Sequence, residues 1–353
     1  MRILIIGAGA IGCFVGAKLA GTGAKVTLVG RQWLVDAVHK RGLIVAERDA
    51  PISVQDVRAV TSVAEAFSAR QAYDLAILSV KSYDTETAVI ELKDATAVPL
   101  PILSLQNGIG NEETLAAAFG PEQVIAGVVT TPVAMPEPGR VASRKVGGQI
   151  VLALLAPGAV SSSPRMLLAD ALLNSFHQSG FRASLVSDWR ALKWTKLLLN
   201  MVGNATSAIL DWTPQQVFAD RRIATLEVRA LREALAVMRA QGLAPISLGG
   251  YPVPLLAGIE GVLPTPFLGY ILGKAGAGGR GGKMPSLHMD LSTGKGKSEV
   301  AYLNGAVMKR GAELGIPTPV NRALTTILMG LVRGDIPWEQ YRNLPERLLA
   351  AAS

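Results

Sequence analysis

The chain has 353 residues, of which 49% are hydrophobic and 18% are charged. This composition supplies ample apolar material for a buried core and excludes an intrinsically disordered chain. The formal net charge of +8 favours anionic ligands. With aromatic residues at only 5% and no basic run longer than two residues, nucleic acid is not an expected partner.

The single cysteine, Cys13, and three scattered histidines exclude a disulfide framework and a thiolate metal centre, so no metal is expected. Met1 leads directly into a strand-like run, which does not resemble a cleavable signal. The apolar run 150–156 is too short to span a bilayer. We therefore expect a cytoplasmic protein without a membrane partner.

A dinucleotide-binding pattern opens the chain. The apolar run Arg2–Ile6 precedes GAGAIG, a helix-like segment and a second strand-like run at Lys25–Val29. Strand, glycine turn, helix and strand in this order are what a Rossmann-type domain requires. The first glycine permits a tight turn, the second admits the pyrophosphate and the third permits close packing of helix and strand. The residues expected to bind the cofactor here are Gly7, Ala8, Gly9, Ala10, Ile11 and Gly12.

The end of the second strand indicates which dinucleotide is bound. NAD sites usually place Asp or Glu at this position to bind the ribose hydroxyls. This chain has Gly30 and Arg31 instead. A guanidinium pairs with the 2′-phosphate of NADP, whereas a carboxylate would repel it. The pattern favours NADP(H) over NAD, although Arg31 could also be a solvated residue at a helix start.

Polar residues follow two further strand-like runs. The run 74–80 leads into Lys81, and the run 101–105 leads into Asn107. Ligands of open α/β sheets bind beyond the carboxyl ends of the strands, so both residues are expected to contact the cofactor. The alternative for Lys81 is a solvated residue at a helix start. The runs 124–131 and 148–156 are expected to continue the sheet.

The second half of the chain is expected to be almost wholly helical after a helix near 163–178 and a strand near 181–186. We place the boundary between domains 1–186 and 187–353. The apolar stretch 189–210 is predicted to be one long helix, on which Lys196, Asn200 and Asn204 share one side. Burying an ammonium and two amides is costly, so this stripe indicates a site. The alternative is a set of satisfied core amides with a lysine that reaches solvent.

Glycine and proline dominate 244–285, and residues 273–282 hold six glycines. We expect this part to be a loop with little regular structure. Glu299 follows Ser298 at a predicted helix start, where its carboxylate is either an N-terminal charge or a site residue.

In combination and order, six motifs resemble ketopantoate reductase (2-dehydropantoate 2-reductase) over essentially the full length of the chain. They are GAGAIG at 7–12, SVK at 79–81, LQNGIGNEE at 105–113, WTKLLLN with a following asparagine at 194–204, PSLHMD at 285–290, and SEVAYLNG at 298–305 with GIPTP at 315–319. Two segments depart from the family, namely the glycine-rich 273–282 and SSSPRML at 161–167.

The resemblance implies an α/β N-terminal Rossmann-type dinucleotide-binding domain plus an all-α C-terminal domain, with the substrate cleft between them. It implies that Lys196 is the general acid and that Asn107 and Glu299 also belong to the catalytic set. Asn200 and Asn204 would bind the hydroxyl end of the substrate, and Ser286 its carboxylate. Glu299 and Asn107 would also contact the cofactor, and Arg31 and Lys81 match the family's contacts to the NADP phosphate.

The expected activity is therefore NADPH-dependent reduction of 2-dehydropantoate to pantoate, a step in pantothenate and coenzyme A biosynthesis. Two alternatives stay open: an NADP-dependent reductase of another branched α-keto acid, and a non-catalytic NADP-binding regulatory module. The expected partner is a small α-keto acid. The oligomeric state is left open, with a homodimer as one option.

Overall fold

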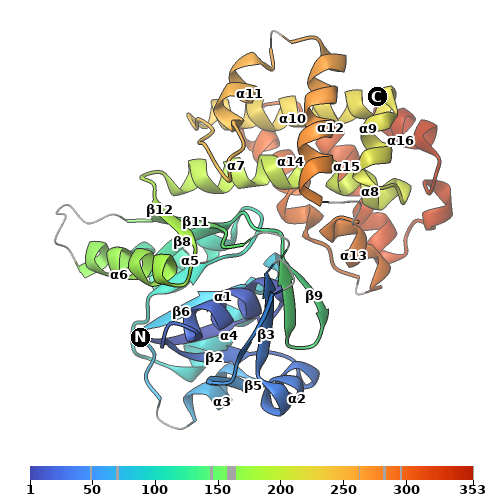
Figure 1. Ribbon diagram of the computed structural model, residues 1–353. Coiled ribbons are helices and arrows are strands. Elements are labelled where there is room, and N and C mark those ends of the chain that lie inside the picture. The colour runs from blue at the N-terminus through green and yellow to red at the C-terminus, as the bar shows by residue number, and fades with distance from the viewer. Residues whose placement is uncertain are drawn as a thin grey trace. The chain divides into compact units, whose positions relative to one another are not determined.

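The computed structural model describes residues 1–47, 50–68, 71–143, 146–156, 164–261, 263–280, 284–294 and 296–352. The chain forms two compact units (Figure 1). The first comprises Met1–Gln106 and Gly110–Leu192, and the second comprises Asn107–Ile109 and Lys193–Ser353. A short segment around Asn107 thus belongs to the second unit although the sequence on both sides of it belongs to the first.

The first unit is built on an eight-stranded sheet with the order β12-β11-β8-β7-β6-β1-β2-β5. All neighbouring pairs are parallel except β11 and β8, which are antiparallel. The strands are β1 (Arg2–Ile6), β2 (Lys25–Val29), β5 (Val57–Val60), β6 (Leu75–Leu78), β7 (Ile102–Ser104), β8 (Val124–Val129), β11 (Gln149–Leu154) and β12 (Arg182–Leu185). The expected Rossmann-type sheet is confirmed.

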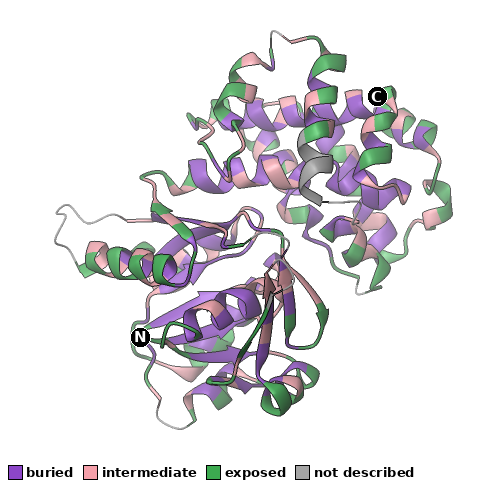
Figure 2. Ribbon diagram, in the orientation of Figure 1, coloured by how far each residue is buried: buried purple, intermediate pink, exposed green. Residues whose placement is uncertain are grey.

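Both faces of this sheet are buried, which explains why its strands are almost continuously apolar. In β1, Ile3 and Ile5 belong to one hydrophobic cluster, whereas Leu4 and Ile6 belong to another. The first cluster includes residues from helices α1 (Ala10–Ala20), α2 (Gln32–Arg41) and α6 (Pro164–Gln178). Helices α3 (Val63–Phe67), α4 (Thr85–Ala95) and α5 (Asn111–Phe119) contribute to the second. Figure 2 shows the central strands as buried and the outer side of α6 as exposed.

Two glycines let the β1–α1 turn approach the end of β6. Gly7 has φ +101°, and a Cβ added there would lie 2.4 Å from the backbone nitrogen of Val80. A Cβ on Gly12 would lie 2.4 Å from the Gly7 carbonyl oxygen and 2.6 Å from Ser79 Oγ. The Ser79 hydroxyl donates to that same carbonyl at 2.8 Å. The turn therefore sits where strand order reverses between β1 and β6, the place at which α/β sheets bind ligands.

A second, four-stranded sheet in the first unit has no counterpart in the sequence-based prediction. Its order is β4-β3-β10-β9, formed by β3 (Leu43–Glu47), β4 (Ala50–Val54), β9 (Ala134–Glu137) and β10 (Arg140–Ser143). These strands are short, and β4 and β9 carry proline or charged residues. Their pairing joins segments almost a hundred residues apart, and local patterns do not carry such information.

The second unit is helical, as expected. Its helices are α7 (Trp189–Met201), α8 (Asn204–Leu210), α9 (Pro214–Ala219), α10 (Arg221–Ala240), α11 (Val253–Ile259), α12 (Thr265–Arg280), α13 (Ser286–Ser292), α14 (Asn304–Glu313), α15 (Pro319–Arg333) and α16 (Pro345–Ala351), with short 3₁₀ turns at Glu299–Tyr302 and Trp338–Gln340. Across the described ranges, none of the helices is both long and apolar enough to span a membrane.

The prediction of one helix over 189–210 is wrong, because the helix is interrupted between α7 and α8. Gly203 adopts a left-handed conformation with φ +64°. The buried carboxylate of Glu227, on α10, accepts a hydrogen bond from the Gly203 amide at 2.7 Å and another from the Thr206 hydroxyl. A glycine takes this conformation without steric cost, and the carboxylate satisfies groups that the break exposes.

The prediction of an irregular loop over 244–285 is also wrong for most of its length. Helix α11 lies within it, and α12 extends through Arg280; residues 281–283 lie outside the described ranges, as do 161–163 of the second departing segment. Two glycines of α12, Gly269 and Gly273, permit close helix packing. A Cβ on Gly273 would lie 2.9 Å from Phe218 Cβ on α9, and one on Gly269 would lie 3.3 Å from Ala224 Cβ on α10. Tertiary contacts therefore outweigh the low helix propensity of glycine.

Gly12→Ala tests the close approach at the β1–α1 turn. The new Cβ would be forced against backbone, so we expect a loss of about 1–3 kcal/mol in unfolding free energy despite the better helix propensity of alanine. Gly9→Ala is the matched control, because nothing lies within 4 Å of its Cβ position and its φ of −82° suits alanine. Urea unfolding followed by circular dichroism measures both. Equal stability of the two variants would contradict the close-packing role of Gly12.

Candidate functional site

The N-terminus of α1 is open toward an anionic ligand. Gly9 is the N-cap, with no side chain bonded to the first turn and no acidic residue within it. Space remains around Gly9, since an added Cβ would meet no atom within 4 Å. The first-turn amides and the positive end of the helix dipole together form the arrangement that binds phosphate groups at such helix ends. The glycine turn predicted from the sequence thus fits a dinucleotide pyrophosphate.

Arg31 lies directly after β2 and Gly30, at the N-cap of α2. Its side chain is exposed, and its guanidinium has no ion pair or hydrogen bond with another residue in the described ranges. Trp33, two residues further on, is 43% exposed. An exposed guanidinium at this position can pair with a phosphate.

A buried polar cluster among the residues that follow β6 and β7 was not predicted from the sequence. Gln106 Nε2 donates to Thr85 Oγ1 at 2.8 Å and to the Val80 carbonyl at 3.2 Å. Asn111 Oδ1 accepts from Thr85 Oγ1 at 2.8 Å, and Asn111 Nδ2 donates to Ser82 Oγ at 3.3 Å. These bonds tie the loop after β6 to the loop after β7. The available signal was a run of polar residues directly after each apolar strand.

Lys81 is partly exposed and caps the 3₁₀ turn Ser82–Asp84 that follows β6. Asn107 is also partly exposed, two residues beyond Leu105 at the end of the β7 run. Both residues therefore follow the carboxyl ends of adjacent parallel strands, as the sequence pattern predicts. Asn107 belongs to the second compact unit, however, whereas Lys81 belongs to the first.

Four of the predicted site residues form one hydrogen-bonded chain in the second unit. Asn200 Nδ2 donates to Asn107 Oδ1 at 2.9 Å. Asn204 Nδ2 donates to the Asn200 carbonyl at 3.0 Å and to Ser286 Oγ at 3.4 Å, while Asn204 Oδ1 accepts from the Leu287 amide at 3.1 Å. Asn204 is 4% exposed, and Ser286 is exposed. Segments distant in sequence are thus brought together through amide side chains.

Lys196 lies one helical turn before Asn200 on α7 and is partly exposed, among leucines that are buried. Glu299 begins the 3₁₀ turn after Ser298 and is 4% exposed. Its backbone amide donates to Asp290 Oδ2 at 3.2 Å. The same turn is fixed to the Asn107 segment, because the Ile109 amide donates to the Tyr302 carbonyl at 3.0 Å. Asp290 is a further residue that sequence reasoning did not single out.

Cys13 is unsuited to nucleophilic chemistry. It is fully buried in α1, and burial raises the pKa of its thiol to about 12. The thiol is therefore neutral at physiological pH and lacks the thiolate form needed for nucleophilic attack.

A glycine turn at the switch point of a parallel sheet, with a lysine and asparagines gathered on a helical unit, defines an α/β dinucleotide-binding oxidoreductase. The chain belongs to the ketopantoate reductase PanE/ApbA family. The family model matches residues 3–157, and its C-terminal counterpart, "Ketopantoate reductase PanE/ApbA C terminal", matches residues 188–332. The two matches flank the stretch that holds α6 and β12.

Curated relatives match along almost the whole chain. A 2-dehydropantoate 2-reductase from Pyrococcus horikoshii is 29% identical over 328 residues, which are 93% of this chain and 96% of that protein. The enzyme of the same name from Archaeoglobus fulgidus is 28% identical over 333 residues, covering 94% of this chain and 98% of the relative.

Solved structures support the same fold. The PanE/ApbA family ketopantoate reductase from Ralstonia eutropha has a TM-score of 0.77 at 29% identity, covering 95% of this chain and 99% of that one. D-mandelate dehydrogenase with NADH and anilino(oxo)acetate has a TM-score of 0.78 with the same coverage, but at 20% identity it supports the fold alone.

Proposed function

We propose that this protein is an NADPH-dependent 2-dehydropantoate 2-reductase, which reduces ketopantoate to pantoate. The observation that carries the proposal is the hydrogen-bonded chain Asn107–Asn200–Asn204–Ser286 beside Lys196, in a member of the ketopantoate reductase family. The curated relatives named 2-dehydropantoate 2-reductase support the choice of substrate. The step would belong to pantothenate and coenzyme A biosynthesis.

The residues of the first unit suit NADP(H). The turn from Gly7 to Gly12 would receive the pyrophosphate at the N-terminus of α1. Arg31 would pair with the 2′-phosphate, and Lys81 would assist it. When bound, the reduced nicotinamide supplies the hydride that is transferred to the carbon of the ketone.

The residues of the second unit suit an α-keto acid. Lys196 would donate a proton to the ketone oxygen as negative charge develops there, the role of a general acid. Asn107 would hold Lys196 and the substrate in position. Asn200 and Asn204 would bind the hydroxyl end, and Ser286 the carboxylate. Glu299 would accept hydrogen bonds from substrate or cofactor hydroxyls.

We further propose a cytoplasmic location and a homodimer. A chain with one cysteine suits a reducing compartment. Large apolar side chains on α11 and α12 are exposed, with Leu255 at 62%, Phe267 at 54% and Tyr270 at 58%. Contact with a second copy would remove this surface from water.

Ketopantoate turnover tests the function directly. We expect NADPH oxidation with kcat/KM on the order of 10⁴ M⁻¹s⁻¹ or better, the low end of ordinary enzymes. Absorbance of NADPH with and without ketopantoate measures it, and pyruvate and other branched α-keto acids serve as comparison substrates. Far faster turnover of another keto acid would leave the reaction class but remove ketopantoate as the substrate. No turnover of any keto acid would favour a non-catalytic NADP-binding module.

Arg31→Ala tests the choice of cofactor. The variant should weaken NADPH binding by about 1.5–3 kcal/mol, the contribution of a hydrogen bond to a charged group, and leave NADH binding nearly unchanged. Lys40→Ala is the control, since this exposed cation lies at the other end of the same helix. Fluorescence titration with both cofactors gives the dissociation constants. Equal weakening of NADPH and NADH would show that Arg31 does not distinguish them.

Lys196→Ala tests the general acid. Interactions made mainly in the transition state affect kcat more than KM, so kcat should fall by about 10²–10⁴ while NADPH still binds. A lysine needed only for folding would instead lower the melting temperature and leave turnover of the folded fraction normal. Steady-state kinetics and thermal melting of one preparation separate the two roles, and normal turnover would exclude a catalytic Lys196.

A further inference from the structure

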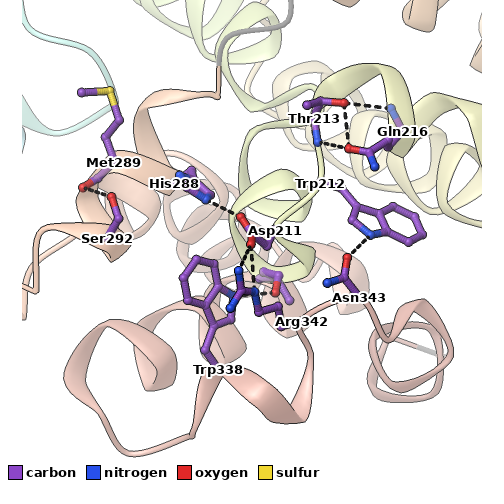
Figure 3. A network of polar contacts seen from close by, with 11 residues as sticks. Asp211, Trp212, Thr213, Gln216, His288, Met289, Ser292, Trp338, Arg342 and Asn343 are labelled. Carbon is purple, nitrogen blue, oxygen red and sulfur yellow. Dashed lines mark hydrogen bonds and ion pairs between the residues drawn. The ribbon is translucent and has the colours of Figure 1, made fainter.

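We propose that His288, Asp211 and Arg342 position the substrate-binding end of α13, with His288 as the residue through which the other two act on Ser286. Their side chains form one network beyond the end of α8 (Figure 3). The inference rests on the proposed function, because it takes Ser286 to be the residue that binds the substrate carboxylate.

The start of α13 is attached to α8 at three successive residues. Ser286 Oγ accepts from Asn204 Nδ2 at 3.4 Å, and the Leu287 amide donates to Asn204 Oδ1 at 3.1 Å. The third attachment is the imidazole of His288, whose Nε2 lies 2.7 Å from Asp211 Oδ1. Asn204 begins α8 and Asp211 follows its last residue, so both ends of α8 hold the first turn of α13.

The position of the Asp211 carboxylate depends on the backbone conformation of this residue and on a second side-chain partner. Asp211 caps α8 in a left-handed conformation with φ +56°, which is uncommon for a residue other than glycine. Its other carboxylate oxygen accepts from Arg342 Nε at 2.8 Å and lies 2.7 Å from Arg342 Nη2. Burial alone would raise the pKa of the Asp211 carboxyl, but the bonds from His288 and Arg342 outweigh it and hold that pKa below its usual value. The carboxylate therefore stays charged at neutral pH.

The segment that carries Arg342 is in turn fastened to α8. Trp338 Nε1 donates to the Ile209 carbonyl at 2.9 Å, and the backbone N–H of Asn343 donates to the Leu210 carbonyl at 3.0 Å. These bonds satisfy carbonyls that the end of a helix leaves open. The Trp338 ring lies 5.6 Å from the His288 ring and 5.3 Å from the Arg342 guanidinium carbon. His288 therefore lies beside both a carboxylate and an aromatic ring.

A short helix needs such an anchor. α13 has only seven residues, and its N-cap residue Pro285 supplies no side-chain cap, so the bond that its first turn receives comes from Asn204 on α8. Helices of this length have little stability of their own, so tertiary contacts fix where they lie. Ser286 is two residues from His288, so loss of the ring contact would let the Ser286 hydroxyl move. The change would not alter Lys196 or the residues proposed to bind the cofactor.

His288→Leu tests the proposal, with His288→Gln as the conservative variant whose amide can still donate to Asp211. We expect His288→Leu to raise KM for ketopantoate about tenfold, which corresponds to about 1.4 kcal/mol, with kcat and NADPH affinity close to wild type. His288→Gln should recover most of the loss. Trp212→Phe is the control, because it removes the Trp212–Asn343 hydrogen bond at the same helix end, on the side away from His288 (Figure 3). If His288→Leu and Trp212→Phe gave the same KM, the positioning role would be overturned.

Hydrogen exchange of residues 284–294 separates this inference from the proposed function. Exchange should be faster in His288→Leu than in wild type and Trp212→Phe, and equal rates would overturn the anchor. This measurement needs no turnover, so it decides the anchor even if wild type fails to reduce ketopantoate, the result that would remove the proposed function. If His288→Leu does not fold, Asp211→Asn takes its place, since asparagine tolerates the left-handed conformation. Unchanged exchange and KM in that variant would likewise overturn the proposal.

Discussion

The break at Gly203 is the constraint on which the second unit depends. An uninterrupted helix from Trp189 to Leu210 would carry Asn204 two turns beyond Lys196 along a single axis. Instead, the left-handed Gly203 turns the chain, and the buried Glu227 carboxylate holds the turn by bonding the Gly203 amide and the Thr206 hydroxyl. Burying a carboxylate is costly unless it is hydrogen-bonded, so these partners account for its presence on the apolar side of α10. Asn204 becomes the first residue of α8, where its amide reaches both α7 and α13.

The first unit has a similar interruption at the turn that we propose to bind the cofactor. A left-handed glycine, Gly7, turns the chain out of β1, and a second glycine, Gly12, lets the helix approach the Gly7 carbonyl and Ser79. In each unit, the proposed site residues lie where a regular element is interrupted and neighbouring residues bond to the interruption. Backbone strain and close packing of this kind are tolerated when the surrounding structure determines them.

The sequence predicted features whose cause is local. The apolar run of β1, the spacing of Gly7 and Gly12, and the polar residues after β6 and β7 each reflect a requirement met within a few residues, and the structure confirms their positions. The failures share another cause. Gly203 looked like one glycine inside an apolar helix, because its partner Glu227 lies 24 residues away. The glycine-rich part of α12 resembled a loop, because the residues against which Gly269 and Gly273 pack, Ala224 and Phe218, are remote in sequence. Long-range contacts decided each case, and no local pattern records them.

Asn200 and Asn204 differ in how much of their hydrogen-bonding capacity is left for a substrate. An amide side chain offers two donors and an acceptor oxygen with two lone pairs. Asn204 uses both donors, on the Asn200 carbonyl and Ser286, and one lone pair on the Leu287 amide. A substrate hydroxyl could therefore reach it only by donating to Oδ1 or by replacing the Ser286 bond, which at 3.4 Å is the longest of the set. Asn200 uses one donor on Asn107. In the proposed function, the direct contact to a substrate hydroxyl would therefore fall more readily to Asn200, whereas Asn204 bonds Ser286 and the first turn of α13.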